Sequence, residues 1–169
     1  DLNGVDDSRT LELAVTYNNM SAVYSRLGKF DDSIKFAEDS LRIREALGGN
    51  HVDVALSYNN IGLTYYYTNQ LEESLRMHQK ALGIREANLG MNHIDVAISY
   101  FNLGNVYSRL GNFIKAVEMH TKALNIKKNK YGECHVEVAL SYNYMGIMYG
   151  EKCRFSEALE MHSKSLNIR

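Results

Sequence analysis

The sequence predicts an all-α fold, a right-handed α-solenoid of four antiparallel helix pairs. Three observations predict it: a motif that recurs every 42 residues, apolar side chains spaced as on an amphipathic helix, and the absence of proline from a chain of 169 residues. A period of roughly 20 to 50 residues is typical of solenoids, in which each repeat buries its apolar face by stacking on its neighbours. Proline interrupts helices, so its absence suits long ones.

The recurring motif marks the first half of each repeat. It reads His-Val-Asp-Val-Ala-Leu-Ser-Tyr at residues 51–58 and returns with small changes at 93–100 and 135–142, while a shortened copy occupies 14–17. We therefore expect a non-repeat leader over residues 1–9 and a single domain over 10–169. The expected repeats are about 10–50, 51–92, 93–134 and 135–169.

The first half of each repeat is predicted to be a helix that packs against a partner helix. In the second repeat, Tyr58, Ile61, Gly62 and Tyr65 have the i, i+3, i+4, i+7 spacing of one helix face. The third position of this stripe is Gly or Ser in all four repeats. Such residues remove side-chain bulk, so we expect a second helix to approach closely there.

The second half of each repeat is predicted to be that partner helix. It carries its own apolar stripe, which includes Phe113 and Leu124 in the third repeat. An asparagine such as Asn92 is expected to cap the next first helix. Residues that tolerate the left-handed conformation separate the two helices of a repeat, with one exception in the last: Gly28, Asn69, Gly111 and Cys153.

These patterns resemble tetratricopeptide repeats. The pattern Tyr-x-x-[Ile/Leu/Met]-[Gly/Ser]-x-x-Tyr recurs four times in register, and Gly-x-Phe turns occupy 28–30 and 111–113. The 42-residue length is similar to the repeats of the kinesin light chain and nephrocystin groups. Tyrosine replaces the usual tryptophan, and the proline that ends the second helix is missing. The resemblance implies a protein-interaction scaffold that binds peptides on the concave face of its first helices.

A second face of the first helices is the predicted site for an extended peptide. At about 100° per residue, Asn60 lies about 200° from Tyr58, and a primary amide can pair with both polar groups of a peptide unit. Helices about 10 Å apart and a peptide that advances about 3.3 Å per residue place one asparagine at about every third residue. The candidate peptide-binding residues are Asn19, Arg26, Asn60, Leu63, Tyr67, Asn102, Asn105, Arg109 and Tyr144.

Alternatives exist for each part of this site. The asparagines could instead bond to adjacent helices and fix the twist of the solenoid. Tyr144 interrupts the asparagine column and favours a side-chain pocket in the fourth repeat. Arg26 and Arg109 favour an acidic peptide, a preference that the resemblance to kinesin light chain also implies, although solvated charges at helix ends explain them equally well.

Composition argues against several other functions. With 19 Lys+Arg against 20 Asp+Glu, the chain has no basic field to hold nucleic acid or an anionic membrane, and no apolar run approaches the roughly 20 residues of a membrane span. The six histidines are two repeated positions rather than a metal site, so we expect no cofactor and no enzyme activity. Two cysteines make no disulfide framework, which favours a cytoplasmic location.

A second function also fits the sequence, that of a structural spacer or self-association module within a larger protein. The second helix of the fourth repeat carries apolar residues that a further repeat would cover in a solenoid. We expect Leu159, Leu166 and Ile168 to lack that cover, and to permit end-to-end self-association.

Overall fold

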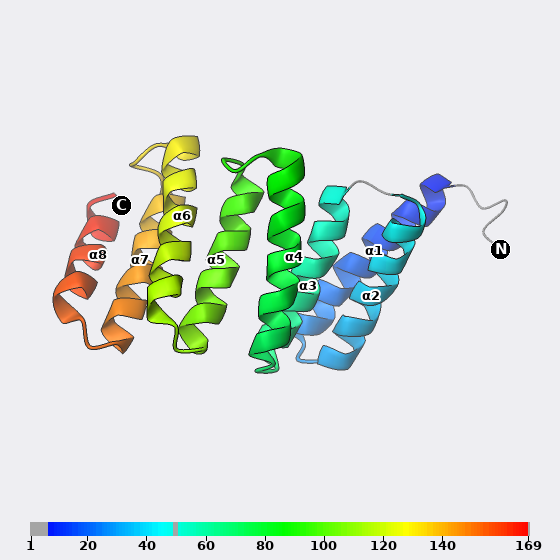
Figure 1. Ribbon diagram of the computed structural model, residues 1–169, viewed down its shortest axis with the longest axis horizontal. Helices are drawn as coiled ribbons and strands as arrows, with labels where there is room; N and C mark the ends of the chain where they lie inside the picture. The colour runs from blue at the N-terminus through cyan, green and yellow to red at the C-terminus, as the bar shows by residue number, and fades with distance from the viewer. Residues whose placement is uncertain (1–6, 49–50, 169) are drawn as a thin grey trace. The chain divides into compact units, whose positions relative to one another are not determined.

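The computed structural model describes residues 7–48 and 51–168, and these residues form eight helices and no strand (Figure 1). The helices are α1 (Asp7–Arg26), α2 (Phe30–Ala46), α3 (His51–Tyr67), α4 (Leu71–Leu89), α5 (Ile94–Arg109), α6 (Phe113–Tyr131), α7 (Val136–Glu151) and α8 (Phe155–Ile168). They divide into two compact units, which we call unit 1 (Asp1–Asn88) and unit 2 (Leu89–Arg169). The predicted all-α fold of four helix pairs is confirmed.

The two helices of each pair meet where the sequence has its small residue. A methyl group added to Gly104 would lie 2.7 Å from the ring of His120, and one added to Gly62 would lie 2.9 Å from that of His78. The expected close approach is therefore confirmed, and a histidine of the second helix fills the space. In the first pair, Ala37 occupies the histidine position. The residue before it, Phe36, stacks on Tyr24 with the ring centroids 5.2 Å apart.

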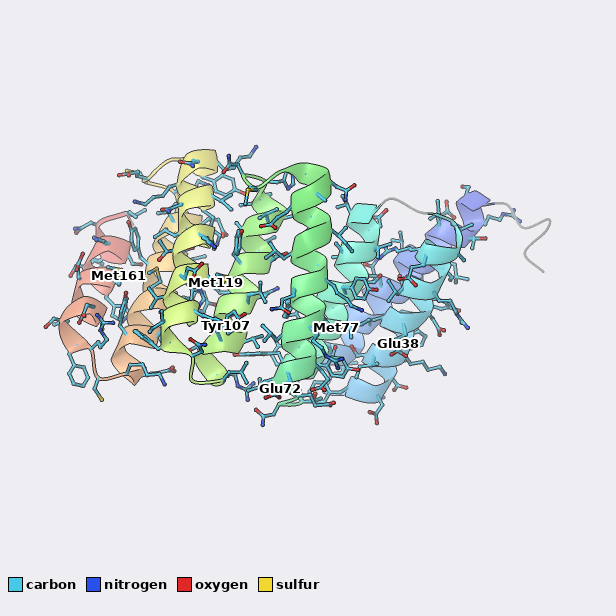
Figure 2. The ribbon with its side chains drawn as sticks, in the orientation of Figure 1. Glu38, Glu72, Met77, Tyr107, Met119 and Met161 are labelled. Atoms are coloured by element: carbon cyan, nitrogen blue, oxygen red, sulfur yellow. The ribbon has the colours of Figure 1, made fainter. Side chains whose placement is uncertain are left out.

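Burial changes the acid–base behaviour of these histidines. His78 and His120 are buried, and the loss of solvation lowers the pKa of each to about 4, helped by the positive charges of Arg85 and Lys127 respectively. Both ring nitrogens of His78 lack a hydrogen-bond partner among the described residues. The residues before them, Met77 and Met119, are labelled with their counterpart Met161 on α4, α6 and α8 in Figure 2.

The first helices of unit 2 begin with a histidine cap. His93 Nδ1 accepts a hydrogen bond from the Asp95 backbone N–H at 3.2 Å, and His135 Nδ1 accepts one from Glu137 at the same distance. The prediction that Asn92 caps α5 is therefore wrong, because the imidazole nitrogen of the next residue does so. Asn50, the corresponding residue before α3, lies outside the described residues.

Contacts between consecutive pairs of unit 1 are polar. Ser33 Oγ of α2 lies 2.8 Å from Thr64 Oγ1 of α3 in a buried hydrogen bond. Arg44 is also buried, and its Nη1 donates to the Asp53 carbonyl and to Ser57 Oγ, both at 2.7 Å. The start of α3 is thus held by the end of α2.

Contacts between α6 and α7 of unit 2 are mostly apolar and aromatic. Phe113 meets Tyr149 edge to face with the ring centroids 5.5 Å apart, and Lys127 Nζ pairs with Glu137 Oε2 at 3.0 Å. A core cluster joins the two helices through Leu124, Val138, Tyr142 and Met145. Within the described part of the chain, no helix is both long and apolar enough to cross a membrane.

Candidate functional site

A cavity of about 240 Å³ lies between α1 and α3 in unit 1. It brings together four of the nine predicted site residues, Arg26, Asn60, Leu63 and Tyr67, and is completed by Ser21, Ala22 and Ser25. At roughly 30 Å³ per water molecule, it has room for about eight waters. It is smaller than the roughly 300 to 1,000 Å³ of drug-sized pockets, so it suits one or two side chains of a larger ligand.

Asn60 contributes only part of its amide to this cavity. Its Nδ2 donates to Asn18 Oδ1 on the neighbouring helix at 3.0 Å, with the Asn18 carbonyl oxygen 3.4 Å away. The hydrogen bond is of the kind that the alternative interpretation expects for the asparagines. Because Asn60 Oδ1 makes no hydrogen bond among the described residues, this oxygen is the part of the side chain that can still accept one from a ligand.

The cavity wall on α1 carries a positive charge and an unsatisfied hydroxyl. Arg26 is exposed and makes no ion pair with any described residue. Ser25 Oγ is buried and has no hydrogen-bond partner in the described structure, whereas Ser21 Oγ lies 3.2 Å from Ser33 Oγ. A buried polar atom without a partner is costly, so Ser25 favours a ligand or solvent group in the cavity.

The wall on α3 is apolar and aromatic. Leu63 is half-buried, and Tyr67 exposes 59% of its surface. The Tyr67 ring stands edge-on to that of Tyr66 with the centroids 5.8 Å apart. The cavity therefore pairs a cationic and hydroxyl-bearing side with a side that can cover the carbon atoms of a ligand.

The other five predicted residues do not lie in this cavity. Asn19 faces a different hollow on α1, which it lines with Met20 and Val23. Asn102, Asn105 and Arg109 lie on α5 and Tyr144 on α7, all in unit 2. Of these, Asn102 is buried, and Tyr144 is half-exposed.

Tyr144 has a specific partner in unit 2. Its ring meets Phe101 edge to face with the centroids 5.0 Å apart. In the repeat register, Tyr144 corresponds to Asn60 and Phe101 to Asn18. An aromatic pair in unit 2 thus occupies the positions of the asparagine pair in unit 1.

Sequence reasoning missed Asn18 and Ser25. The sequence did contain a signal for Asn18. Asn18 and Asn60 are both asparagine in unit 1, and the residues at the same repeat positions in unit 2, Phe101 and Tyr144, are both aromatic. No pattern marked Ser25, since its importance lies in a buried hydroxyl that has no hydrogen-bond partner among the described residues.

The described residues contain no group of three His, Cys, Asp or Glu side chains placed to hold a metal ion. Cys134 and Cys153 are both free and exposed.

Comparisons with known proteins agree with the helix-pair architecture. A family model described as Tetratricopeptide repeat matches residues 12–87, 70–129 and 95–169. No curated protein matches the chain.

Several solved structures share the fold. BtubC (BKLC) from P. vanneervenii is 24% identical with a TM-score of 0.85, and the match covers 100% of this chain and 66% of that one. The nearly identical repeats of a putative kinesin light chain from Podospora anserina are 18% identical with a TM-score of 0.80. That match covers 94% of this chain and 75% of the other. A Rap protein complexed with Competence and Sporulation Factor is 17% identical with a TM-score of 0.84, and the match covers 99% of this chain and 45% of that one. The chain thus spans between about half and three quarters of these proteins.

Proposed function

Because the chain belongs to the tetratricopeptide repeat family, a family of protein-interaction scaffolds, we propose that it binds an extended, acidic peptide segment of a protein partner and has no catalytic role. The observation that carries this proposal is the cavity between α1 and α3, where four residues selected from the sequence alone lie together. The Rap neighbour solved with a bound factor supports a binding role for this fold.

The cavity chemistry favours a carboxylate side chain as the group that enters. Arg26 supplies the positive charge, and Ser25 supplies a hydroxyl that lacks a partner in the described structure. Hydrogen bonds to charged groups contribute about 1.5 to 3 kcal/mol each. Asn60 Oδ1 accepts a backbone N–H of the peptide, while Leu63 and Tyr67 cover its apolar atoms.

Unit 2 adds a different type of contact. Tyr144, which is half-exposed and packs edge to face on Phe101, provides an aromatic surface for an apolar side chain of a peptide. Asn105 and Arg109 complete the proposed site in this unit, with Asn102 as a structural support because it is buried. In unit 1, Asn19 is the remaining residue of the proposed ligand surface, and it lines the separate hollow on α1.

The test compares Arg26→Gln with Arg9→Gln, because both arginines are exposed residues of α1 and only Arg26 lines the cavity. Peptide arrays rich in Asp and Glu, with matched Asn and Gln arrays, supply the probes, and fluorescence polarisation gives the affinity. We expect Arg26→Gln to weaken acidic-peptide binding about tenfold, which equals about 1.4 kcal/mol, and Arg9→Gln to leave it unchanged. Equal losses in both variants would show unspecific charge attraction instead.

Ser25→Ala provides a second, independent arm. Removing an unpaired buried hydroxyl should leave the thermal stability of the free protein unchanged or slightly higher. Peptide affinity should nevertheless fall several-fold, because the ligand loses a hydrogen bond. An unchanged affinity would remove Ser25 from the site, and a parent protein that binds no peptide of either array would end the proposal.

A second function, self-association or a spacer role, is favoured by one observation: Phe155, Leu159 and Leu166 of α8 are all exposed. Ile168 is an exception to the expectation, because it packs against the core cluster around Leu124. We also propose a cytoplasmic location, since both cysteines are unpaired thiols.

A further inference from the structure

Two helices of the chain carry large apolar side chains that their counterparts elsewhere in the chain bury. On α8, Leu166 is 73% exposed, whereas Leu124 at the same repeat position on α6 is 6% exposed. On α1, Leu13 is 43% exposed and Val23 54%, whereas Val138 and Met148 at the same positions on α7 are 0% and 4% exposed. Each helix thus presents one side of an interface that is closed in unit 2.

The contact of α6 with α7 shows how those two sides fit. Leu124 of α6 packs among Val138, Tyr142 and Met145 of α7, and Phe113 of α6 meets Tyr149 of α7 edge to face. The second helix of one pair thus places a leucine and a phenylalanine against the aromatic and aliphatic side chains on the first helix of the following pair.

The exposed helices repeat both sides of this contact with the same side-chain types. In place of Leu124 and Phe113, α8 has Leu166 and Phe155. In place of Val138, Tyr142, Met145 and Tyr149, α1 has Leu13, Tyr17, Met20 and Tyr24.

The surface of α1 also has a suitable hollow. Its volume is about 480 Å³, and its lining includes Met20, Val23, Tyr24 and Leu27. Tyr24 is the counterpart of Tyr149, so the hollow lies where the contact of α6 with α7 would place the ring of Phe155. Phe155 is 64% exposed on α8. A large aromatic side chain in a preformed hollow is a typical anchor of a protein interface.

The ion pair between α6 and α7 has counterparts in the sequence as well, on α1 and directly after α8. Lys127 pairs with Glu137 between α6 and α7. Glu12, which is exposed on α1, takes the position of Glu137, and Arg169 takes that of Lys127, although Arg169 lies outside the described residues. The acidic residue again belongs to the first half of a repeat and the basic residue to the second, so the two charges are of opposite sign.

We infer that α8 of one copy of this chain packs on α1 of a second copy, in the register in which α6 packs on α7. The inference rests on the self-association proposed above and is independent of peptide binding. Because the two surfaces differ, the contact is heterologous, and an open assembly keeps one uncovered α1 surface and one uncovered α8 surface. Such contacts extend into open chains unless they close into a ring.

The test uses the 169-residue chain with one variant for each surface, Leu166→Glu for α8 and Leu13→Glu for α1. Ile114→Glu is the matched control, since Ile114 is an exposed apolar residue of α6 outside both surfaces. Circular dichroism and thermal unfolding check that each variant folds, and sedimentation velocity over a concentration series measures the mass.

The parent and Ile114→Glu should grow in mass with concentration. Leu166→Glu and Leu13→Glu should each remain monomeric alone, because each lacks one of the two required surfaces. Their equimolar mixture should form a species of twice the monomer mass and nothing larger, since one intact α8 then meets one intact α1.

Other results would overturn the inference. If Leu13→Glu alone still dimerised, α8 would pair with α8 in a symmetric contact. A parent that stayed monomeric throughout would show that these surfaces are left for other segments or partners. Acidic-peptide binding, measured on the same variants, should be unchanged, so failure of this inference and failure of the peptide-binding proposal are distinguishable.

Discussion

Unit 1 and unit 2 join their helix pairs at the same positions with different chemistry. In unit 1, buried hydroxyls of Ser33 and Thr64 bond to each other across α2 and α3. The corresponding positions in unit 2 are Ala116 and Met148, which are buried and apolar. Arg44, buried with two hydrogen bonds, corresponds to Lys127, which pairs with a half-exposed Glu137.

The difference shows that the backbone arrangement of this repeat does not depend on one type of side-chain contact. Hydrogen bonds in a buried interface are directional and leave a cost when one partner is lost. Apolar contacts are adaptable, and their cost scales with the volume removed. Unit 1 should therefore respond to the loss of single polar atoms, and unit 2 to the loss of bulk.

The largest predicted effect is a pH dependence of the free energy of unfolding. Both units share it, so it tests a property in which the two units should not differ. His78 and His120 have pKa values lowered from 6.5 to about 4, so the unfolded chain binds more protons than the folded one between these values. Stability is fully present above pH 6.5 and is lost as the pH falls towards 4. The expected loss at pH 4 is about 3 kcal/mol for each histidine.

Urea unfolding at a series of pH values measures this loss. His120→Phe, which places an aromatic ring that cannot be protonated at this position, should remove about half of it. If His120→Phe kept the full pH dependence, carboxylates rather than the buried histidines would be responsible.

The next effect separates the two units directly. Arg44→Ala removes two hydrogen bonds from a buried cation and should lower the free energy of unfolding by about 2 to 3 kcal/mol. Lys127→Ala at the equivalent position should cost less than about 1 kcal/mol, because its partner is half-exposed. Denaturant unfolding of both variants measures the pair, and equal losses would contradict the proposed difference between the interfaces.

A smaller effect tests whether unit 1 can adopt the chemistry of unit 2. Ser33→Ala and Thr64→Val should each cost about 1 kcal/mol, because each removes one partner of a buried hydrogen bond. The double variant, which gives this contact the apolar character of unit 2, should cost about as much as either single change. A double-mutant cycle measures that coupling, and strictly additive losses would show that the two hydroxyls act separately.

The sequence carried the repeat-level features of this fold because they are periodic. The helix pairs, the small residues at Gly62 and Gly104, and the left-handed turns all recur, and recurrence exposes a structural requirement. Features that depend on one contact were missed or misplaced. His93 rather than Asn92 caps α5, and the amide nitrogen of Asn60 donates its hydrogen bond to Asn18 Oδ1.

The candidate site was predictable only in part for the same reason. Helix periodicity placed Arg26, Asn60, Leu63 and Tyr67 on one face, and the structure gathers them around one cavity. Periodicity does not report the curvature or the hydrogen-bond partners that decide which members of a column share a space. Asn19 therefore falls in a different hollow.

The smallest predicted effect compares the inner turn of the last pair of each unit. Asn69 (φ 62°) in unit 1 and Cys153 (φ 58°) in unit 2 both adopt the left-handed conformation that Gly28 and Gly111 adopt elsewhere. Asparagine tolerates this region, whereas cysteine has no local hydrogen bond to offset the crowding of its Cβ. Cys153→Gly should therefore raise the free energy of unfolding by about 0.5 to 1 kcal/mol, net of the entropy that glycine adds to the unfolded chain. Asn69→Gly should change it by less, and thermal unfolding under reducing conditions measures both. A gain at Asn69 equal to that at Cys153 would mean that the strain belongs to the turn itself and not to the cysteine.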